Sequence, residues 1–241
     1  MTIKLYFEDS YLKEFNSIIT EVRPEGVVLE STAFYPVGGG QPSDTGILLS
    51  KGRDYRVTEV SKSGDHIVHR VADQGNLKQG DPVTGLIDWE RRYAHMRYHT
   101  AVHIIDAIVN RKGSLEGSIT GSQLYQDRAR VDFNLESLTR EMAQEFVDEA
   151  NAVARSNVAV TARYLTPKDA ENYPRLARTA PGRELLRTLD RIRVVDIEGV
   201  DFQSDGGTHV SRTGEVGKII MDRIESKGRN NKRLIFHLED S

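Results

Sequence analysis

The sequence of 241 residues predicts an α+β protein built of two domains. Short β-rich segments separated by turn residues fill residues 1–87, a pattern typical of a small β-barrel or sandwich. Two long stretches with apolar residues at every third or fourth position follow, and these predict amphipathic helices. Further β-rich segments alternate with the helices. Residues 88–241 should therefore form an α/β domain in which long helices lie on an antiparallel sheet.

The first domain, residues 1–87, contains six predicted strands. Pro24-Glu25-Gly26 predicts a hairpin turn between the second and third strands, and Gly64-Asp65 predicts one between the fourth and fifth. The regular spacing of the strands favours an N-terminal small β-barrel. The predicted strands are Ile3–Tyr6, Phe15–Val22, Val27–Leu29, Tyr55–Val60, His66–Val71 and Val83–Ile87.

The second domain begins at Asp88, whose side chain can cap a helix over Trp89–Arg111 that Gly113 closes. A second helix is predicted over Glu136–Arg155, where apolar residues recur at spacings of three and four. Thr166-Pro167 combines a capping threonine with proline at the first helical position and predicts a short third helix. The predicted strands are Ala129–Phe133, Val158–Tyr164, Ile192–Asp196, Glu215–Ile224 and Leu234–Leu238.

Composition excludes several classes of protein. The chain has no cysteine, which rules out disulfides, thiol nucleophiles and cysteine-ligated metal sites. No apolar run approaches the ~20 residues of a membrane helix, and the first ten residues do not resemble a signal peptide. We therefore expect a soluble, cytoplasmic protein without a membrane partner. Any zinc site would have to use histidine and carboxylate ligands.

Basic residues gather in two places although the formal net charge is -3. Residues 163–193 hold eight Arg and Lys against four acids. A second group, called here the basic cluster, consists of Lys227, Arg229, Lys232 and Arg233. Such patches are compatible with binding to a phosphate backbone and equally with a solvated face of mixed charge.

His99 and His103 lie four residues apart in the first predicted helix. This spacing places both imidazoles on one helical face, where they can bind one metal ion. Zinc proteases use the same spacing with a glutamate after the first histidine, but Thr100 stands there and cannot act as a base. His95 lies on the same face and is expected to cap or pack rather than to bind metal. The pair alone fits both a metal site and ordinary buried histidines.

Asp205-Gly-Gly-Thr-His209 supplies a second pair of potential ligands. The two glycines allow a sharp turn, so that the flanking side chains can converge on a site built elsewhere. Together with His99 and His103 they offer three imidazoles and one carboxylate, a set that suits Zn²⁺. The alternative is a simple turn followed by a histidine at a strand edge.

A glycine-rich segment, residues 30–44, lies in the first domain. Gly38 to Gly40 leave the backbone N–H groups unobstructed and allow another chain or a nucleotide to approach closely. A flexible hairpin tip would account for the glycines as well. The flanking Phe34-Tyr35-Pro36 and Gln41-Pro42 would stiffen the segment, which a mere linker does not need.

Taken in order, these segments give the chain a family resemblance. It resembles the AlaX family of alanyl-tRNA trans-editing proteins, which are similar to the editing domain of alanyl-tRNA synthetase. The glycine-rich first domain resembles the medium-sized form of the family. The resemblance covers nearly the whole chain and rests on Thr32-Ala-Phe-Tyr-Pro, Gly38-Gly-Gly-Gln-Pro-Ser-Asp-Thr-Gly46, Arg97-Tyr-His-Thr-Ala-Val-His103, Gly121-Ser-Gln, Ala129-Arg-Val-Asp-Phe133, Asp205-Gly-Gly-Thr-His209, Thr213-Gly-Glu-Val-Gly-Lys218 and Ile224-Glu-Ser-Lys-Gly228.

The resemblance implies a zinc-dependent hydrolase that removes a wrong amino acid, chiefly serine, from mischarged alanine tRNA. The sequence leaves open whether glycine is removed as well. It implies zinc binding by His99, His103, Asp205 and His209, where Asp205 replaces the cysteine usual in the family. It implies that Thr32 binds the serine hydroxyl. The remaining catalytic candidates are Gln41, which would orient the ester or water, Gly39 and Gly40, which would stabilise the oxyanion, and Thr100 and Thr208, which would support the metal ligands.

The partner implied is mischarged alanine tRNA, and the sequence makes no prediction about oligomeric state. Its candidate contacts are Arg97, Lys218, Lys227, Arg229, Lys232 and Arg233. Two other functions fit part of the sequence. Gly39-Gly40-Gln41 also matches the tripeptide with which peptide release factors promote hydrolysis of peptidyl-tRNA. With the cysteine replaced by Asp205, the fold could also serve as a catalytically weak or inactive tRNA-binding module.

Overall fold

The computed structural model describes residues 1–112, 119–177 and 180–240. This part of the chain divides into two compact units, unit 1 (Met1–His95) and unit 2 (Met96–Ser241). The division falls inside helix α1 (Trp89–Lys112), whereas the sequence places the domain boundary between residues 87 and 88. In the described part of the chain, no helix is long and apolar enough to cross a membrane.

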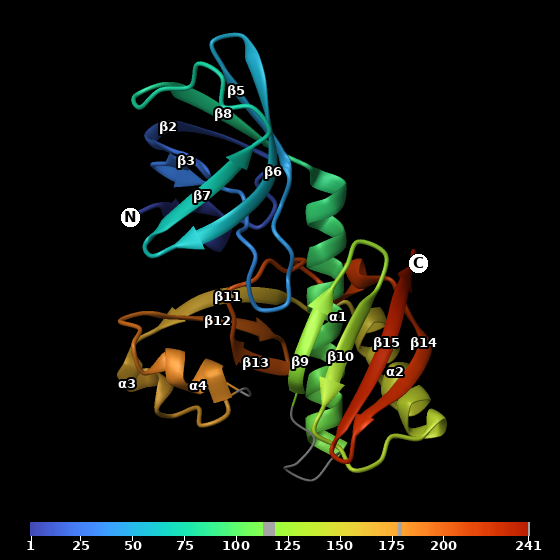
Figure 1. The fold of residues 1–241 in the computed structure, drawn as a ribbon. Coiled ribbons are helices and arrows are strands. Elements are labelled where there is room, and N and C mark those ends of the chain that lie inside the picture. Colours follow the sequence, from blue (N-terminus) through green and yellow to red (C-terminus); the bar gives the residue numbers. More distant parts are fainter. Residues whose placement is uncertain (113–118, 178–179, 241) are drawn as a thin grey trace. The chain divides into compact units, whose positions relative to one another are not determined.

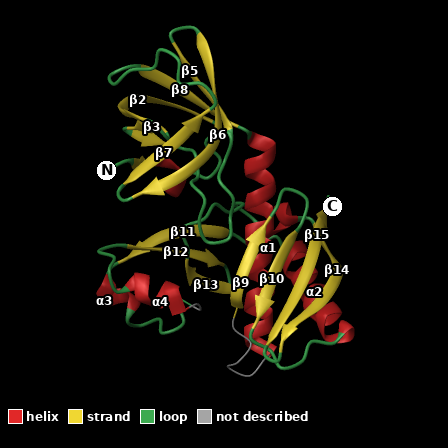
Figure 2. Cartoon of the chain, viewed as in Figure 1, coloured by secondary structure: helices red, strands yellow, loops and turns green. Residues whose placement is uncertain are grey.

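Unit 1 is built mainly of strands (Figure 2) and centres on a closed antiparallel barrel with the order β2-β3-β7-β6-β5-β8 (Figure 1). A short parallel pair, β1 with β4, lies outside the barrel order, and a 3₁₀ helix, η1, follows β1. The predicted small β-barrel is therefore confirmed. The bounds are β1 Ile3–Lys4, η1 Leu5–Phe7, β2 Glu14–Arg23, β3 Gly26–Leu29, β4 Ser31–Thr32, β5 Gly46–Ser50, β6 Arg53–Ser63, β7 His66–Val71 and β8 Pro82–Ile87.

The two predicted hairpins of unit 1 are confirmed, because Arg23 pairs with Gly26 and Ser63 pairs with His66. The prediction of a strand over Ile3–Tyr6 is wrong beyond Lys4. The chain instead turns through η1, which buries Tyr6 completely and brings its ring centroid 5.4 Å from that of Tyr35. Strand β5 was missed by the sequence analysis.

A buried histidine links three segments of unit 1. His69 Nδ1 lies 3.1 Å from the carbonyl oxygen of Val27, and its Nε2 lies 2.7 Å from Thr32 Oγ1. Because the carbonyl can only accept, Nδ1 carries the proton and Nε2 accepts from the Thr32 hydroxyl. Thr32 Oγ1 in turn accepts from the backbone N–H of Phe34 at 3.1 Å. Burial lowers the pKa of His69 to about 4, so the imidazole is neutral at pH 7.

A second buried polar contact fastens the glycine-rich segment. Arg92 on α1 forms an ion pair with Asp44, and both side chains are inaccessible to solvent. Arg92 also donates to the carbonyl oxygens of Ser10 and Ala33, at 2.9 and 2.5 Å. Asp44 accepts from the backbone N–H of Tyr35 at 2.6 Å. Because each charge has several partners, the pair fixes the base of the glycine-rich segment without leaving a buried charge uncompensated.

Unit 2 contains a four-stranded antiparallel sheet, β14-β15-β10-β9, with α1 and α2 behind it in the view of Figure 1. The ring of Tyr98 on α1 lies 6.0 Å from that of Phe236 on β15, and Asn151 on α2 exchanges two 2.8 Å hydrogen bonds with the backbone of Ile219. The predicted helices on an antiparallel sheet are confirmed. The bounds are β9 Ile119–Leu124, β10 Ala129–Phe133, α2 Arg140–Ser156, β14 Lys218–Gly228 and β15 Asn231–Glu239.

A separate three-stranded sheet, β11-β12-β13, completes unit 2. Its apolar face, centred on Leu165, Ile192 and Val194, packs under the segment that carries two short helices. Strand β13 is absent from the strands predicted from the sequence. A 3₁₀ helix, η2, follows it. The bounds are β11 Val160–Leu165, α3 Pro167–Ala170, α4 Ala180–Leu186, β12 Ile192–Ile197, β13 Asp201–Ser204 and η2 Thr213–Val216.

The helix ends show which capping signals were read correctly. Asp88 Oδ1 accepts from the N–H of Arg91 at 3.3 Å, as the predicted cap requires. Thr166 caps α3 ahead of Pro167, also as predicted. Helix α2 starts four residues later than the predicted Glu136, because Thr139 caps it by accepting from Met142. The predicted strand start at Glu215 is wrong, since that residue lies in η2. Gly113 lies outside the described residues.

The buried imidazole of His69 should make unit 1 sensitive to acid. Below pH 6.5 the unfolded chain binds a proton that the folded barrel does not bind until about pH 4. At pH 7 this group therefore costs no folding stability. As the pH falls from 6.5 to about 4, it lowers the free energy of unfolding by up to roughly 3 kcal/mol. Glutamine does not titrate, so the His69→Gln variant should not show this part of the loss of folding stability on acidification.

The single tryptophan, Trp89, lies in unit 1 and allows the measurement on the whole chain. Urea unfolding followed by its fluorescence, at steps from pH 7 to pH 4, should give a shallower decline for His69→Gln than for the parent. Parallel curves for the two proteins would show that His69 does not contribute.

Candidate metal centre

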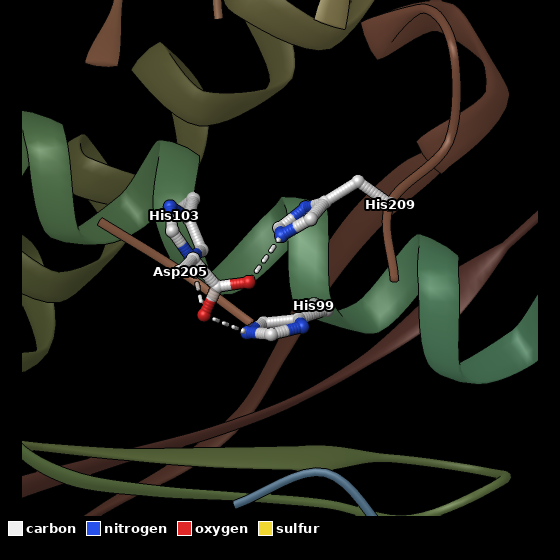
Figure 3. Close-up of side chains that lie close together, drawn as sticks. All are labelled: His99, His103, Asp205 and His209. Atoms are coloured by element: carbon white, nitrogen blue, oxygen red, sulfur yellow. Dashed lines mark hydrogen bonds and ion pairs between the residues drawn. The ribbon is translucent and has the colours of Figure 1, made fainter. Parts of the chain in front are cut away.

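Helix α1 presents two histidines to the centre of unit 2. His99 and His103 are one turn apart, their ring centroids are separated by 5.1 Å, and both are almost fully buried. Figure 3 shows both rings directed to the same carboxylate. The spacing of four residues that was recognised in the sequence therefore places two imidazoles at one point.

Asp205 and His209 reach the same point from the segment after β13. Asp205 Oδ2 lies 3.1 Å from His209 Nε2 and accepts from the N–H of Gly207 at 2.5 Å. Asp205 Oδ1 lies 3.6 Å from His99 Nε2 and 3.9 Å from His103 Nε2. The short turn through two glycines allows the aspartate and the histidine to face each other, as the dashed contacts in Figure 3 show.

The four-ligand cluster, His99, His103, Asp205 and His209, has the dimensions of a zinc site. One nitrogen or oxygen from each residue lies within 4.8 Å of the others. Zinc bonds of about 2.0–2.2 Å at tetrahedral angles place ligand atoms about 3.3–3.6 Å apart, and the three contacts to Asp205 span 3.1–3.9 Å. Three imidazoles with one carboxylate therefore fit a Zn²⁺ ion with little movement.

Burial sets the protonation of the cluster. It lowers the pKa of His99 well below its ordinary value and that of His209 to about 4, so both offer a free nitrogen lone pair at pH 7. Burial alone would raise the pKa of Asp205, but the imidazoles of His99, His209 and His103 outweigh it and hold the pKa well below its usual range. His103 differs: burial alone would lower its pKa, but the carboxylates of Asp201 and Asp205 outweigh burial and raise it. The centre thus presents two neutral imidazoles and an ionised carboxylate, the ligand forms that a divalent cation requires.

Neighbouring groups hold the ligands in place. Thr100 Oγ1 lies 3.1 Å from His209 Nδ1 and accepts from the N–H of Val210 at 3.4 Å. Arg193 donates to the carbonyl oxygens of Asp205 and Gly207, at 2.9 and 3.2 Å, which stabilises the turn. Thr208 is fully buried.

His95, which the sequence analysis expected to cap or pack rather than to bind metal, is not part of the four-ligand cluster. Its ring is completely buried, and neither nitrogen has a hydrogen-bond partner in the described part of the chain. Burial lowers its pKa to about 4.

The glycine-rich segment forms a tight turn in unit 1. Gly38 and Gln41 exchange two backbone hydrogen bonds, of 3.1 and 2.9 Å, across Gly39 and Gly40. Gly39 and Gly40 have φ values of +60° and +84°, the positive values that a two-residue hairpin turn of this kind demands. The side chain of Gln41 is buried. The catalytic candidates Thr32, Gly39, Gly40 and Gln41 thus belong to unit 1, and the four candidate metal ligands belong to unit 2.

The basic candidates for nucleic-acid contact differ in how far they are engaged within unit 2. Arg97 donates to the carbonyl oxygen of Val216 at 3.0 Å and pairs with Asp240 at 2.8 Å, and Arg233 pairs with Asp132 at 2.6 Å. These two side chains are only 17% and 20% exposed. The more exposed candidates are Lys218, Lys227 and Arg229, while Lys232 is half-buried at the turn between β14 and β15.

One group next to the cluster was missed by the sequence analysis. Asp201 on β13 accepts from His103 Nδ1 at 3.0 Å. Had β13 been recognised as a strand, the alternation of Asp201, Gln203 and Asp205 would have indicated that all three side chains share one face. The sequence analysis predicted no strand there and so did not find this signal.

Comparisons with known proteins relate both units to enzymes of tRNA aminoacylation. Residues 5–91 match the family model for tRNA synthetases class II (A), and residues 192–235 match that for the threonyl and alanyl tRNA synthetase second additional domain. The alanyl-tRNA editing protein AlaX-M of Methanosarcina mazei is 41% identical, over 100% of this chain and 98% of its own. AlaX-M of Saccharolobus solfataricus is 38% identical over 98% of both chains. The alanine–tRNA ligase of Pyrococcus abyssi is 40% identical over 98% of this chain, but over only 26% of the ligase.

Asp205 should contribute directly to metal affinity. Asp205→Ala removes one of four ligands, and zinc affinity should fall by at least the 10–100-fold that loss of a supporting partner costs. Asp205→Cys should raise the affinity for zinc, because thiolate is the softer ligand. Metal analysis and chelator competition on the purified parent and both variants measure this. Equal zinc content and affinity in all three would place Asp205 outside the metal coordination.

Proposed function

Because this chain belongs to the AlaX family of alanyl-tRNA editing proteins and is of the AlaX-M form, we propose that it deacylates mischarged alanine tRNA. The bond cleaved is the ester between the amino acid and the 3′ end of the tRNA. Seryl-tRNA(Ala) is the principal substrate and glycyl-tRNA(Ala) the second. The observation that supports the proposal is the four-ligand cluster, whose residues could hold a metal ion for hydrolysis in a chain related to editing proteins over its full length.

The chemistry of amino-acid selection supports an editing role. A pocket built for alanine cannot strongly reject a rival that adds only a hydroxyl, so errors must be removed at a second site. A site that binds the serine hydroxyl rejects alanine far more strongly, because its own polar group would be left unpaired. The partner we propose is therefore mischarged alanine tRNA, and the compartment is the cytoplasm, where translation occurs.

We propose one Zn²⁺ ion held by His99, His103, Asp205 and His209. When bound, the ion polarises the ester carbonyl or acidifies water for the attack. His99 and His209 are neutral through burial and bind through Nε2 without first losing a proton. Asp205 supplies negative charge, and the Gly207 N–H and the Arg193 contacts hold it in position. Thr100 orients His209, and Thr208 supports the same turn.

The glycine-rich turn is the proposed source of oxyanion donors. Its hairpin hydrogen bonds use the backbone groups of Gly38 and Gln41, which leaves the N–H groups of Gly39 and Gly40 to other acceptors. Such N–H groups stabilise the charge that develops on the ester oxygen. The burial of the Gln41 side chain favours a role in shaping this turn, and it gives no support to the reading of Gly39-Gly40-Gln41 as a release-factor tripeptide.

The surface proposed for the tRNA backbone lies at the turn between β14 and β15. Lys227 and Arg229 are exposed there, and Lys232 donates to the carbonyl oxygens of Gly228 and Arg229, at 2.7 and 2.8 Å, which keeps its charge beside theirs. Arg233 supports the fold next to this turn through its ion pair with Asp132, whereas Arg97 lies at the other end of the β14–β15 hairpin, beside Val216 and Asp240. Lys218 is exposed on β14.

The direct test is a deacylation assay with seryl-tRNA(Ala) and alanyl-tRNA(Ala), with and without a chelator. The serine ester should be cleaved, the alanine ester spared, and the chelator should stop the reaction. His103→Ala should reduce the rate to near that without protein, whereas His237→Ala, which removes a histidine outside the cluster, should not. No turnover of either ester would favour a tRNA-binding module, and chelator-resistant turnover would remove the metal from the reaction.

We further predict that Thr32→Val slows seryl-tRNA deacylation and narrows the preference for serine over alanine, which such recognition can raise to ~10⁴-fold. The buried hydrogen bond of Thr32 to His69 makes a control necessary. His69→Gln disturbs the same contact but keeps the threonine hydroxyl. If a competition assay shows the same selectivity for both variants and the parent, Thr32 serves only to hold the barrel together.

A further inference from the structure

A chain of buried polar side chains extends from the metal centre into unit 2, on the side of His103 that faces away from Asp205. It consists of Asp201 and Gln203 on β13 and of Asp106 and Asn110 on α1. We propose that Asp201, positioned by this chain, orients His103 and strengthens its binding to the metal. The inference rests on the metal centre proposed above and assigns a role to residues outside the four-ligand cluster.

The strand period places the supporting group and a ligand together. Asp201, Gln203 and Asp205 alternate along β13 and its continuation, so their side chains point to the same side of the sheet. Asp201 pairs with Ile197 and Gln203 pairs with Val195, and both of these apolar partners are buried. The same face therefore carries the proposed metal ligand Asp205 and also Asp201, the carboxylate that lies behind the ligand His103.

The helical period brings the polar side chains of α1 to this face. Asp106 follows His103 by three residues and Asn110 follows Asp106 by four, so all three lie along one side of α1. The Asp106 side chain is 2% exposed and that of Gln203 is 8% exposed. In so buried a place each polar atom must find a partner.

The hydrogen bonds among these buried polar side chains have only one consistent direction. Gln203 Nε2 lies 2.7 Å from Asp201 Oδ2 and 3.1 Å from Asp106 Oδ2. Ionised carboxylates only accept, so the amide group of Gln203 donates one proton to each. Asn110 Nδ2 donates to Asp106 Oδ1 at 2.7 Å. The amide of Gln203 therefore holds Asp201 in place, and Asp106 holds the amide.

His103 completes the chain and is oriented by it. Its Nδ1 lies 3.0 Å from Asp201 Oδ2, which fixes the proton on Nδ1 and leaves the lone pair on Nε2. Nε2 is the atom that faces Asp205, at 3.9 Å. A carboxylate behind a metal-binding imidazole fixes the ring orientation and makes the imidazole a stronger ligand. His209 has the neutral hydroxyl of Thr100 in the equivalent place, so the two histidines are supported unequally.

Zinc affinity of the full chain, measured by competition with a chromogenic chelator, tests the proposal. Asp201→Asn keeps the shape and an acceptor oxygen but removes the charge, and it should weaken zinc binding by 10–100-fold. Gln203→Met keeps the volume and removes the amide, and it should cause a smaller loss. The matched control is Asp222→Asn, because Asp222 Oδ1 lies 2.6 Å from His237 Nδ1 in a second histidine–carboxylate pair outside the cluster.

A second measurement needs no metal. In the metal-free protein labelled with ¹⁵N in its histidines, NMR at alkaline pH, where the ring is neutral, should show His103 protonated at Nδ1, and Asp201→Asn should give a mixture of tautomers. If Asp201→Asn fails to fold, Gln203→Met takes its place in both measurements.

Zinc affinity in these variants equal to that of Asp222→Asn would overturn the role of Asp201, with the proposed deacylase function intact. A parent protein that deacylates seryl-tRNA but binds no zinc would overturn both the metal centre and this inference.

Discussion

The requirement that buried polar groups be paired governs the centre of unit 2. Three imidazoles and a carboxylate lie together almost without solvent, and none of them would be stable there alone. The carboxylate of Asp205 is held by the imidazoles and by the N–H of Gly207. These contacts oblige α1 and the segment after β13, about a hundred residues apart in the sequence, to meet at one point. A divalent cation is the group that best completes such a set of ligands.

Unit 1 depends on the same requirement in a different form. Asp44 and Arg92 are buried as an ion pair, and the backbone of Ser10, Ala33 and Tyr35 supplies their remaining hydrogen bonds. The closed barrel has no free edge, so its short strands need no further partner. The glycine-rich turn is therefore anchored by this ion pair, which cannot move without exposing a buried charge.

The predictions from sequence succeeded where a local period carries the information. His99 and His103 share a face because of the helical repeat, and Asp88 and Thr166 cap helices through contacts within one turn. The start of α2 was placed too early, because the residues from Glu136 onward are compatible with a helix. Only the hydrogen bond that the Thr139 side chain accepts from Met142 determines where the helix begins.

The predictions failed where the partner lies far away in the chain. Strand β13 has four residues, two of them polar and buried, and pairing with β12 is what makes it a strand. The support of His103 by Asp201 spans 98 residues and has no local signal. The contact of Thr32 with His69 likewise joins residues 37 positions apart in the sequence.

The turn at Gly39 has an evolutionary consequence. A Cβ atom there would meet no atom of the described residues within 4 Å, so the obstacle that they leave to a side chain is the backbone angle of +60°. Asparagine adopts that angle at modest cost. If the position serves only to reverse the chain, drift among family members should have admitted asparagine there. If it must let a nucleic acid approach the backbone, even that small side chain would have been eliminated, and glycine alone would survive across distant lineages.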